Sequence, residues 1–193
     1  LAHCVWTDES ERNILEETGT HVTHCPSSNM KLASGIAPIV DYLDRGINVA
    51  LGNDGPPCNN TLDPFTEAKQ ASILQKADQL DPTVTPKESI LDMATVNGAK
   101  AAGFDTVGEL KPGWKADIIG ISTDNTQATP LNDILSYIVF AAHGENVEFT
   151  VVDGEFLMED NTVTVVDAES IRQDARRAAE SLDIKGTRSP TSS

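Results

Sequence analysis

The first hundred residues repeat one pattern, in which a short apolar segment is followed by a polar loop and then by an amphipathic helix. Such repeats are typical of parallel β/α units. The apolar segments are 1–5, 20–25 and 47–52, and each predicts one strand. Between the last two strands, apolar residues recur at helical spacing over 36–43, and Gly46 stands where that helix should end. The sequence therefore predicts an α/β fold with parallel strands.

Two further helices are indicated by their expected first turns. Asp63 precedes a proline, which places a capping carboxylate before a proline at the first helical position, and this helix is expected to run towards Leu74. The segment 85–88 (TPKE) matches a capping box and predicts a helix that continues through Ala102.

From about residue 104 the pattern changes to short β-prone segments separated by glycine, proline, asparagine and aspartate. We expect a domain boundary here, followed by strands in place of helices. The pair Asp153-Gly154 predicts the tight turn of a β-hairpin over 147–158.

The segment 168–193 predicts a closing helix and a mobile tail that begins near residue 185. Asp167 is placed to cap this helix. Apolar side chains at helical spacing predict a buried stripe made of Ile171, Ala175, Ala178 and Leu182.

The charge balance argues against two classes of partner. The 193 residues carry 30 acidic and 14 basic side chains, and the net charge of −16 repels phosphate backbones and anionic membrane surfaces. We therefore expect no nucleic acid and no membrane among the partners. Because the carboxylates are scattered along the whole sequence, they favour a solvated acidic surface over a dedicated site for cations.

Cysteine usage and the first residue bear on compartment and completeness. Three cysteines without C-x-x-C spacing argue against a disulfide framework or a structural zinc site, and they favour the cytoplasm. The sequence has no signal peptide pattern. Leu1 stands in a strand context without a start methionine, so we expect an upstream part of the protein to be missing.

Side chains that can carry chemistry follow each predicted strand. These are His3, His24 and Asp54. Reactive groups of a β/α barrel gather at the carboxyl ends of its strands, so two imidazoles and a carboxylate predict a metal or proton-transfer site. Taken singly, each residue is more typical of a structural role, since a lone histidine is usually a hydrogen-bonded structural residue and an aspartate before glycine usually forms a turn.

Two polar loops follow the second and third strands. The loop 52–60 is dense in residues that allow turn geometry, and it either presents a ligand or is simply a long turn. The hydroxyls and amide of 26–31 either bind a polar substrate or cap a helix. His24, Asn29 and Asn53 are accordingly the candidates for substrate binding.

At this point the sequence resembles a known family. The segments LAHCVW, HCPSSNMKLASGIAPI and LGNDGPPCNNTLDPFTEAKQASILQK closely resemble the adenosine-type deaminase and chlorohydrolase branch of the amidohydrolase superfamily. The resemblance implies that 1–103 forms the last three strands, with their helices, of a metal-dependent (β/α)8 TIM barrel. The later segments GELKPGWKADIIGI and VVDGEFLMED resemble the small β-sandwich of that family, which implies a β-sandwich over 104–167, before the closing helix of 168–193.

The resemblance also implies roles for two residues. His3 matches the family's catalytic histidine, which orients the nucleophile, and Asp54 matches the aspartate that both binds the metal and accepts a proton. The implied cofactor is one divalent metal, zinc or alternatively iron, which makes water nucleophilic near neutral pH. Asn53 departs from the threonine that relatives often carry.

The family's other metal ligands match no residue of this chain. Catalytic zinc needs about three protein ligands, so we expect the isolated chain to be inactive. The parent enzyme is expected to deaminate a 5'-substituted adenosine such as S-adenosylhomocysteine, methylthioadenosine or 5'-deoxyadenosine.

Other functions stay open from the sequence. Guanine deaminase and triazine or ethylammeline chlorohydrolase share the motifs, and a non-catalytic interaction module is the alternative of another class. In each enzymatic case the partner is a small nitrogen heterocycle. Because three barrel strands alone leave strand edges unpaired, we also expect a homo-oligomer.

Overall fold

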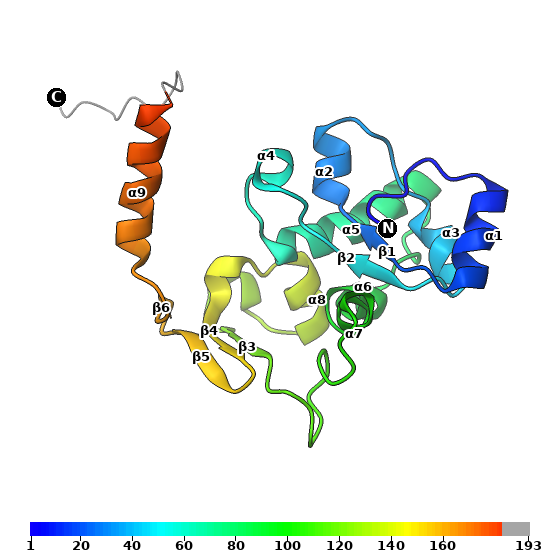
Figure 1. Cartoon of the computed structure of the whole chain (residues 1–193). Coiled ribbons are helices and arrows are strands. Elements are labelled where there is room, and N and C mark those ends of the chain that lie inside the picture. The colour runs from blue at the N-terminus through cyan, green and yellow to red at the C-terminus, as the bar shows by residue number, and fades with distance from the viewer. Residues whose placement is uncertain (183–193) are drawn as a thin grey trace.

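The computed structural model describes residues 1–182, so the predicted tail from residue 185 lies outside the described residues. Its first part is a small parallel sheet surrounded by helices (Figure 1). Strand β1 (Val22–His24) pairs in parallel with β2 (Val49–Leu51), and a parallel bridge joins Ala2 to Thr23. The predicted parallel order of three segments is therefore confirmed, although the first segment contributes only a bridge.

Seven helices of the described residues belong to this part of the chain. They are α1 (Glu9–Thr18), α2 (Pro26–Lys31), α3 (Ile39–Asp44), α4 (Pro56–Asn59), α5 (Pro64–Gln79), α6 (Lys87–Ala94) and α7 (Val96–Ala102). Asp63 caps α5 as predicted, because its side chain accepts a hydrogen bond from the N–H of Phe65. Among residues 1–182, no helix is both long enough and apolar enough to cross a membrane.

The predicted capping box over 85–88 is wrong. The hydroxyl of Thr85 donates to the carbonyl of Ser72 in α5, so it is not available to the first turn of α6, which begins after Pro86 without a side-chain cap. The predicted single helix is also interrupted at Thr95, whose backbone leaves the helical region with φ −125° and ψ −94°. Helices α6 and α7 are therefore separate.

One apolar core joins the sheet to its helices. Val22 and Val49 are fully buried in it, next to side chains of α3 and α6. The largest buried members from those helices are Ile39, Tyr42, Ile90 and Met93. This core fixes both strands relative to the helices around them.

A second sheet follows, made of four antiparallel strands in the order β3-β4-β5-β6. Its strands are β3 (Ile118–Ile121), β4 (Val147–Val152), β5 (Glu155–Glu159) and β6 (Thr162–Val163). The predicted hairpin is confirmed, because Asp153 and Gly154 both have positive φ, at 49° and 85°, between β4 and β5. Such values are those of a type I′ turn.

The expectation of strands in place of helices beyond residue 104 is wrong for one stretch. Helix α8 (Ile134–Phe140) lies between β3 and β4, flanked by the 3-10 turns η1 (Thr126–Ala128) and η2 (Gly144–Asn146). Its sequence, ILSYIVF, is β-prone, but α8 packs against α5 and α6, and Val139 enters the first core. Tertiary packing has overridden local propensity. The boundary at residues 103 and 104 stays a prediction, and the described residues of 104–167 form one sheet instead of two facing ones.

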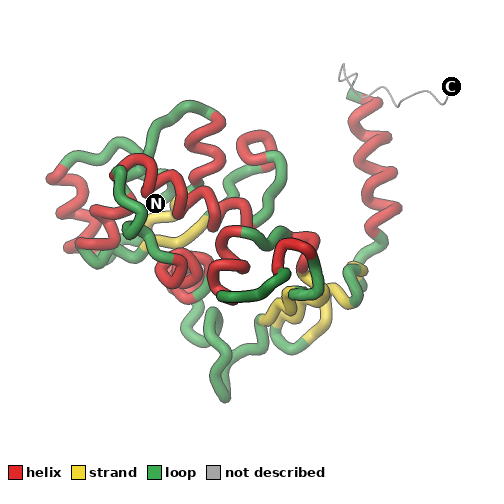
Figure 2. Tube along the Cα trace, turned by 180° about the vertical axis from the view of Figure 1, so that it is seen from behind, coloured by secondary structure: helices red, strands yellow, loops and turns green. Residues whose placement is uncertain are grey.

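Helix α9 (Ala168–Ser181) begins at Asp167 as predicted, but the predicted burial of its stripe is wrong. Ile171 is 53% exposed and Leu182 is 70% exposed. Figures 1 and 2, which view the molecule from opposite sides, both show α9 standing clear of the other helices. Within this chain, the apolar face of α9 is therefore open to solvent.

The core predicts a sharp contrast between two isoleucines, both in helices. Ile90 is fully buried and Ile73 is 46% exposed. Ile90→Ala should lower the free energy of unfolding by about 2–5 kcal/mol, because it removes buried methylene groups and leaves a cavity. Ile73→Ala, the matched control, should stay within about 0.5 kcal/mol. Urea unfolding measures both, and equal losses would contradict this assignment of the core.

Candidate active site

The carboxyl ends of the parallel segments bring together four polar side chains. His3 directly follows Ala2, which forms the bridge to β1. Ser28 and Asn29 lie on α2 just after β1, and Asp54 follows β2. His3 and Asp54 have positive φ values of 66° and 59°. Non-glycine residues in this left-handed region cost energy, and such residues cluster at functional sites.

His3 is oriented by a hydrogen bond to Asn29. The distance between His3 Nδ1 and Asn29 Oδ1 is 2.8 Å. Because the amide oxygen can only accept, the ring donates from Nδ1, and a neutral ring then has Nε2 as its acceptor. This Nε2 lies 3.8 Å from Asp54 Oδ2. The second ring nitrogen of His3 thus faces the carboxylate of Asp54.

Asp54 is held from both sides. Ser28 Oγ donates to Asp54 Oδ2 at 2.5 Å, and the N–H of Gly55 donates to Oδ1 at 2.6 Å. The hydrogen bond from Ser28, followed by that from Gly55, holds the pKa of Asp54 below its usual value. The group is therefore a carboxylate at neutral pH, and each oxygen keeps acceptor capacity for a further partner.

The close approach of β1 and β2 explains a glycine at the edge of this site. A Cβ on Gly52 would lie 2.6 Å from Cγ2 of Thr23 and 3.1 Å from Sγ of Cys25. Only glycine fits there without a shift of β1 or of the loop that carries Asp54.

The three candidates for substrate binding have different surroundings. Asn29 is 1% exposed and has a side-chain N–H group without a partner among the described residues, as has Asn53. His24 is fully buried, and the described residues offer no hydrogen bond to either ring nitrogen. A fully buried ring has no surface to offer a ligand in this conformation. The prediction that His24 binds substrate stays untested, and its burial favours a structural role.

Ser28 was not singled out from the sequence. Its contact with Asp54 joins residues that are 26 positions apart. In the sequence, only its place in a polar loop after a predicted strand points to a functional role. Its neighbours in the loop share that place, so it does not distinguish Ser28 from them.

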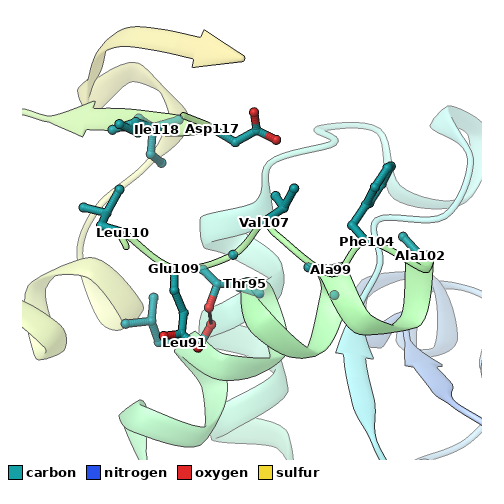
Figure 3. Close-up of a pocket in the computed structure, with 14 residues that line it drawn as sticks. Leu91, Thr95, Ala99, Ala102, Phe104, Val107, Glu109, Leu110, Asp117 and Ile118 are labelled. Atoms are coloured by element: carbon teal, nitrogen blue, oxygen red, sulfur yellow. Dashed lines mark hydrogen bonds between the residues drawn. The ribbon is translucent and has the colours of Figure 1, made fainter. Parts of the chain in front are cut away.

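The described residues form a groove away from this site. A groove of about 670 Å³ lies between helices α6 and α7 on one side and β3 on the other. Figure 3 shows Phe104, Val107 and Leu110 along the segment that joins α7 to β3, opposite Ile118. Its lining is mainly apolar and lacks His3 and Asp54, so it is separate from the polar cluster.

Within residues 1–182, no group of three or more histidine, cysteine, aspartate or glutamate side chains is placed to hold a metal ion. Asp54 is one oxygen ligand of the kind that divalent metals accept. The described residues do not group Asp54 with two further ligands of this kind.

Comparisons with known proteins identify the family. Residues 1–157 match the model of the amidohydrolase family, so the chain belongs to that family. It is 48% identical to a 5'-deoxyadenosine deaminase from Methanosarcina mazei, over 94% of this chain and 42% of that protein. It is 45% identical to a 5-methylthioadenosine/S-adenosylhomocysteine deaminase from Haloarcula marismortui, with the same two coverages.

Solved structures agree with the predicted α/β fold. An adenosine deaminase from Xanthomonas campestris with bound zinc superposes with a TM-score of 0.91 at 32% identity, over 94% of this chain and 42% of that one. An atrazine chlorohydrolase from Arthrobacter aurescens, complexed with zinc, has a TM-score of 0.82 at 25% identity, over 92% and 40%. The chain thus spans well under half the length of the relatives that it matches.

His24 makes stability depend on pH. Burial, with a smaller effect of the nearby His3, lowers the pKa of His24 from 6.5 to about 4. Between these values the unfolded chain binds a proton that the folded chain does not, so stability falls as the pH drops from 6.5 towards 4. The loss attributable to this group should be roughly 3 kcal/mol and should level off below about pH 4.

Urea unfolding at a series of pH values checks this prediction. His24→Gln should remove this part of the pH dependence, while the contribution of the carboxylates remains. The prediction is wrong if wild type and variant lose stability in parallel between pH 6.5 and pH 4.

Proposed function

We propose that this chain carries the His3–Asp54 part of the active site of a hydrolytic deaminase that acts on a 5'-substituted adenosine. The observation behind the proposal is that Asn29 and Ser28, neighbours on one short helix, orient His3 and Asp54 towards each other at the carboxyl ends of the strands. The relatives named as deaminases of 5'-deoxyadenosine or of 5-methylthioadenosine and S-adenosylhomocysteine favour that substrate class.

A divalent metal, zinc, is part of this proposal. Zinc is present in the similar solved deaminase and chlorohydrolase structures. Asp54 is the residue of this chain that would hold the metal, and the metal supplies the acidity that makes water a nucleophile near neutral pH. At least two further protein ligands must come from the rest of a longer protein.

The chain's own residues have two tasks in this reaction. Asp54, ionised at neutral pH, accepts a proton from the attacking water through an oxygen that keeps a free lone pair. His3 places Nε2 beside that oxygen, where it can hydrogen-bond the nucleophile. Water adds to the ring carbon that bears the amino group. The proton taken up by Asp54 then passes to that group, which leaves as ammonia while the ring carbonyl forms.

The main alternative is a reaction with a different leaving group. Because the chain is also similar to an atrazine chlorohydrolase, chloride displacement from a triazine is the second candidate. The two reactions use the same nucleophile and differ in the released product, so ammonia and chloride assays on the longer protein separate them.

Substitutions at the two central residues test the proposal. In the longer protein that carries this chain, Asp54→Asn and His3→Asn should each lower kcat/KM for 5'-deoxyadenosine by about a thousandfold. Asp54→Asn should also lower the zinc content, since it removes a ligand. Asp78→Asn makes the same chemical change at an exposed position of α5 and should alter neither quantity. Ammonia release and metal analysis give the readouts, and full activity of Asp54→Asn would sink the proposal.

We further propose that the isolated chain self-associates and that the protein works in the cytoplasm. In the described residues β2 and β3 each have a partner strand on one side only, and an unpaired edge is a template for another chain. The three free cysteines fit a reducing compartment.

Light scattering on residues 1–193 tests the association. The expected mass exceeds the 20.7 kDa of one chain and rises with concentration. A clean monomer on dilution, in a chain that remains folded by circular dichroism, would contradict it.

A further inference from the structure

Helix α5 carries a buried carboxylate behind the candidate active site. Glu67 is 1% exposed. It accepts hydrogen bonds from the N–H of Ser27 at 3.2 Å, from the hydroxyl of Ser27, and from Nδ2 of Asn59 at 2.6 Å. Three donors from two separate segments therefore converge on one side chain.

Each segment held by Glu67 carries part of the site. Ser27 directly precedes Ser28 and Asn29, which contact Asp54 and His3. The second segment is held through Asn59, whose Nδ2 also donates to the carbonyl of Asn53 at 2.9 Å. Asn53 is the residue before Asp54, so both arms of the His3–Asp54 arrangement are attached to the same carboxylate.

The pattern of donors explains why the side chain is a carboxylate. An ionised glutamate offers only acceptors, which is what two N–H groups and a hydroxyl need. A glutamine would turn an NH2 group towards one of these donors. An apolar side chain would leave the N–H of Ser27 and the amide of Asn59 unpaired, and buried donors without partners are costly.

We propose that Glu67 is a positioning residue, which fixes α2 and the loop after β2 relative to each other and so sets the distance between His3 and Asp54. Because Glu67 is buried, it acts through Ser27 and Asn59 and does not touch substrate. The catalytic meaning of this distance rests on the proposed function, whereas the coupling of the two segments does not.

Amide hydrogen exchange on the longer protein without metal tests the coupling, with Glu67→Gln as the variant. The exchange of segments 26–31 and 53–62 should become faster by about tenfold in both, because a hydrogen bond to a charged acceptor is lost. The second segment is informative since Asn59 Oδ1 holds the N–H groups of Thr61 and Leu62.

Gln75→Leu is the matched control. Gln75 is also on α5 and fully buried, and its Nε2 donates to the carbonyl of Ala37 at 3.0 Å, away from both segments. This variant should leave the exchange of 26–31 and 53–62 unchanged. If Glu67→Gln leaves the two segments unchanged, or speeds all segments equally, the positioning role is overturned.

Two milder variants keep the test decisive if Glu67→Gln does not fold. Ser27→Ala should speed exchange mainly in 26–31, and Asn59→Ala mainly in 53–62. The absence of both local effects overturns the proposal.

Kinetics on the zinc-loaded longer protein add a second readout. Glu67→Gln should lower kcat by about tenfold or more with little change in KM, because the catalytic groups are displaced while substrate contacts remain. A rise in KM alone would contradict a positioning role. If the wild type shows no deaminase activity, the proposed function fails, and the exchange experiment still decides the role of Glu67.

Discussion

The parallel pairing of β1 with β2 is the constraint on which the rest of the site depends. Strands that run the same way release their following segments at the same edge, so α2 and the loop of Asp54 leave the sheet side by side. The approach is so close that Gly52 has no room for a side chain next to Thr23. The apolar core fixes both strands, so only α2 and the loop of Asp54 can still move at the carboxyl edge of the sheet. Hydrogen bonds to buried polar groups restrict the movement of these two segments.

Local signals in the sequence were enough for much of the fold. The apolar segments gave the parallel strands, Asp63 and Asp167 gave two helix starts, and Asp153 with its glycine gave a hairpin turn, because each depends on neighbours in the chain. Two of the wrong predictions depend on distant contacts. Thr85 bonds to α5 instead of capping α6, and α8 is helical because it packs on α5 and α6.

The candidate site, too, contains residues that local sequence signals predict and residues that they do not. His3 and Asp54 could be found from their place after strands, a position that the topology makes meaningful. Glu67 could not, since a glutamate in the first turn of a helix is usually solvent-exposed, and its contact with Ser27 spans 40 positions. Position along a strand predicts which groups reach the edge of a sheet. It does not predict which groups in the layer behind hold them there.

Contacts within this chain order both candidate catalytic residues. Asp54 is fixed by Ser28 and Gly55, and His3 by Asn29, with all partners supplied by this chain. The orientation of the carboxylate is set by these contacts, and its lowered pKa keeps it ionised at neutral pH. Under the proposed function, metal binding by Asp54 would therefore lose little freedom on this side of the site, because folding has already set the geometry.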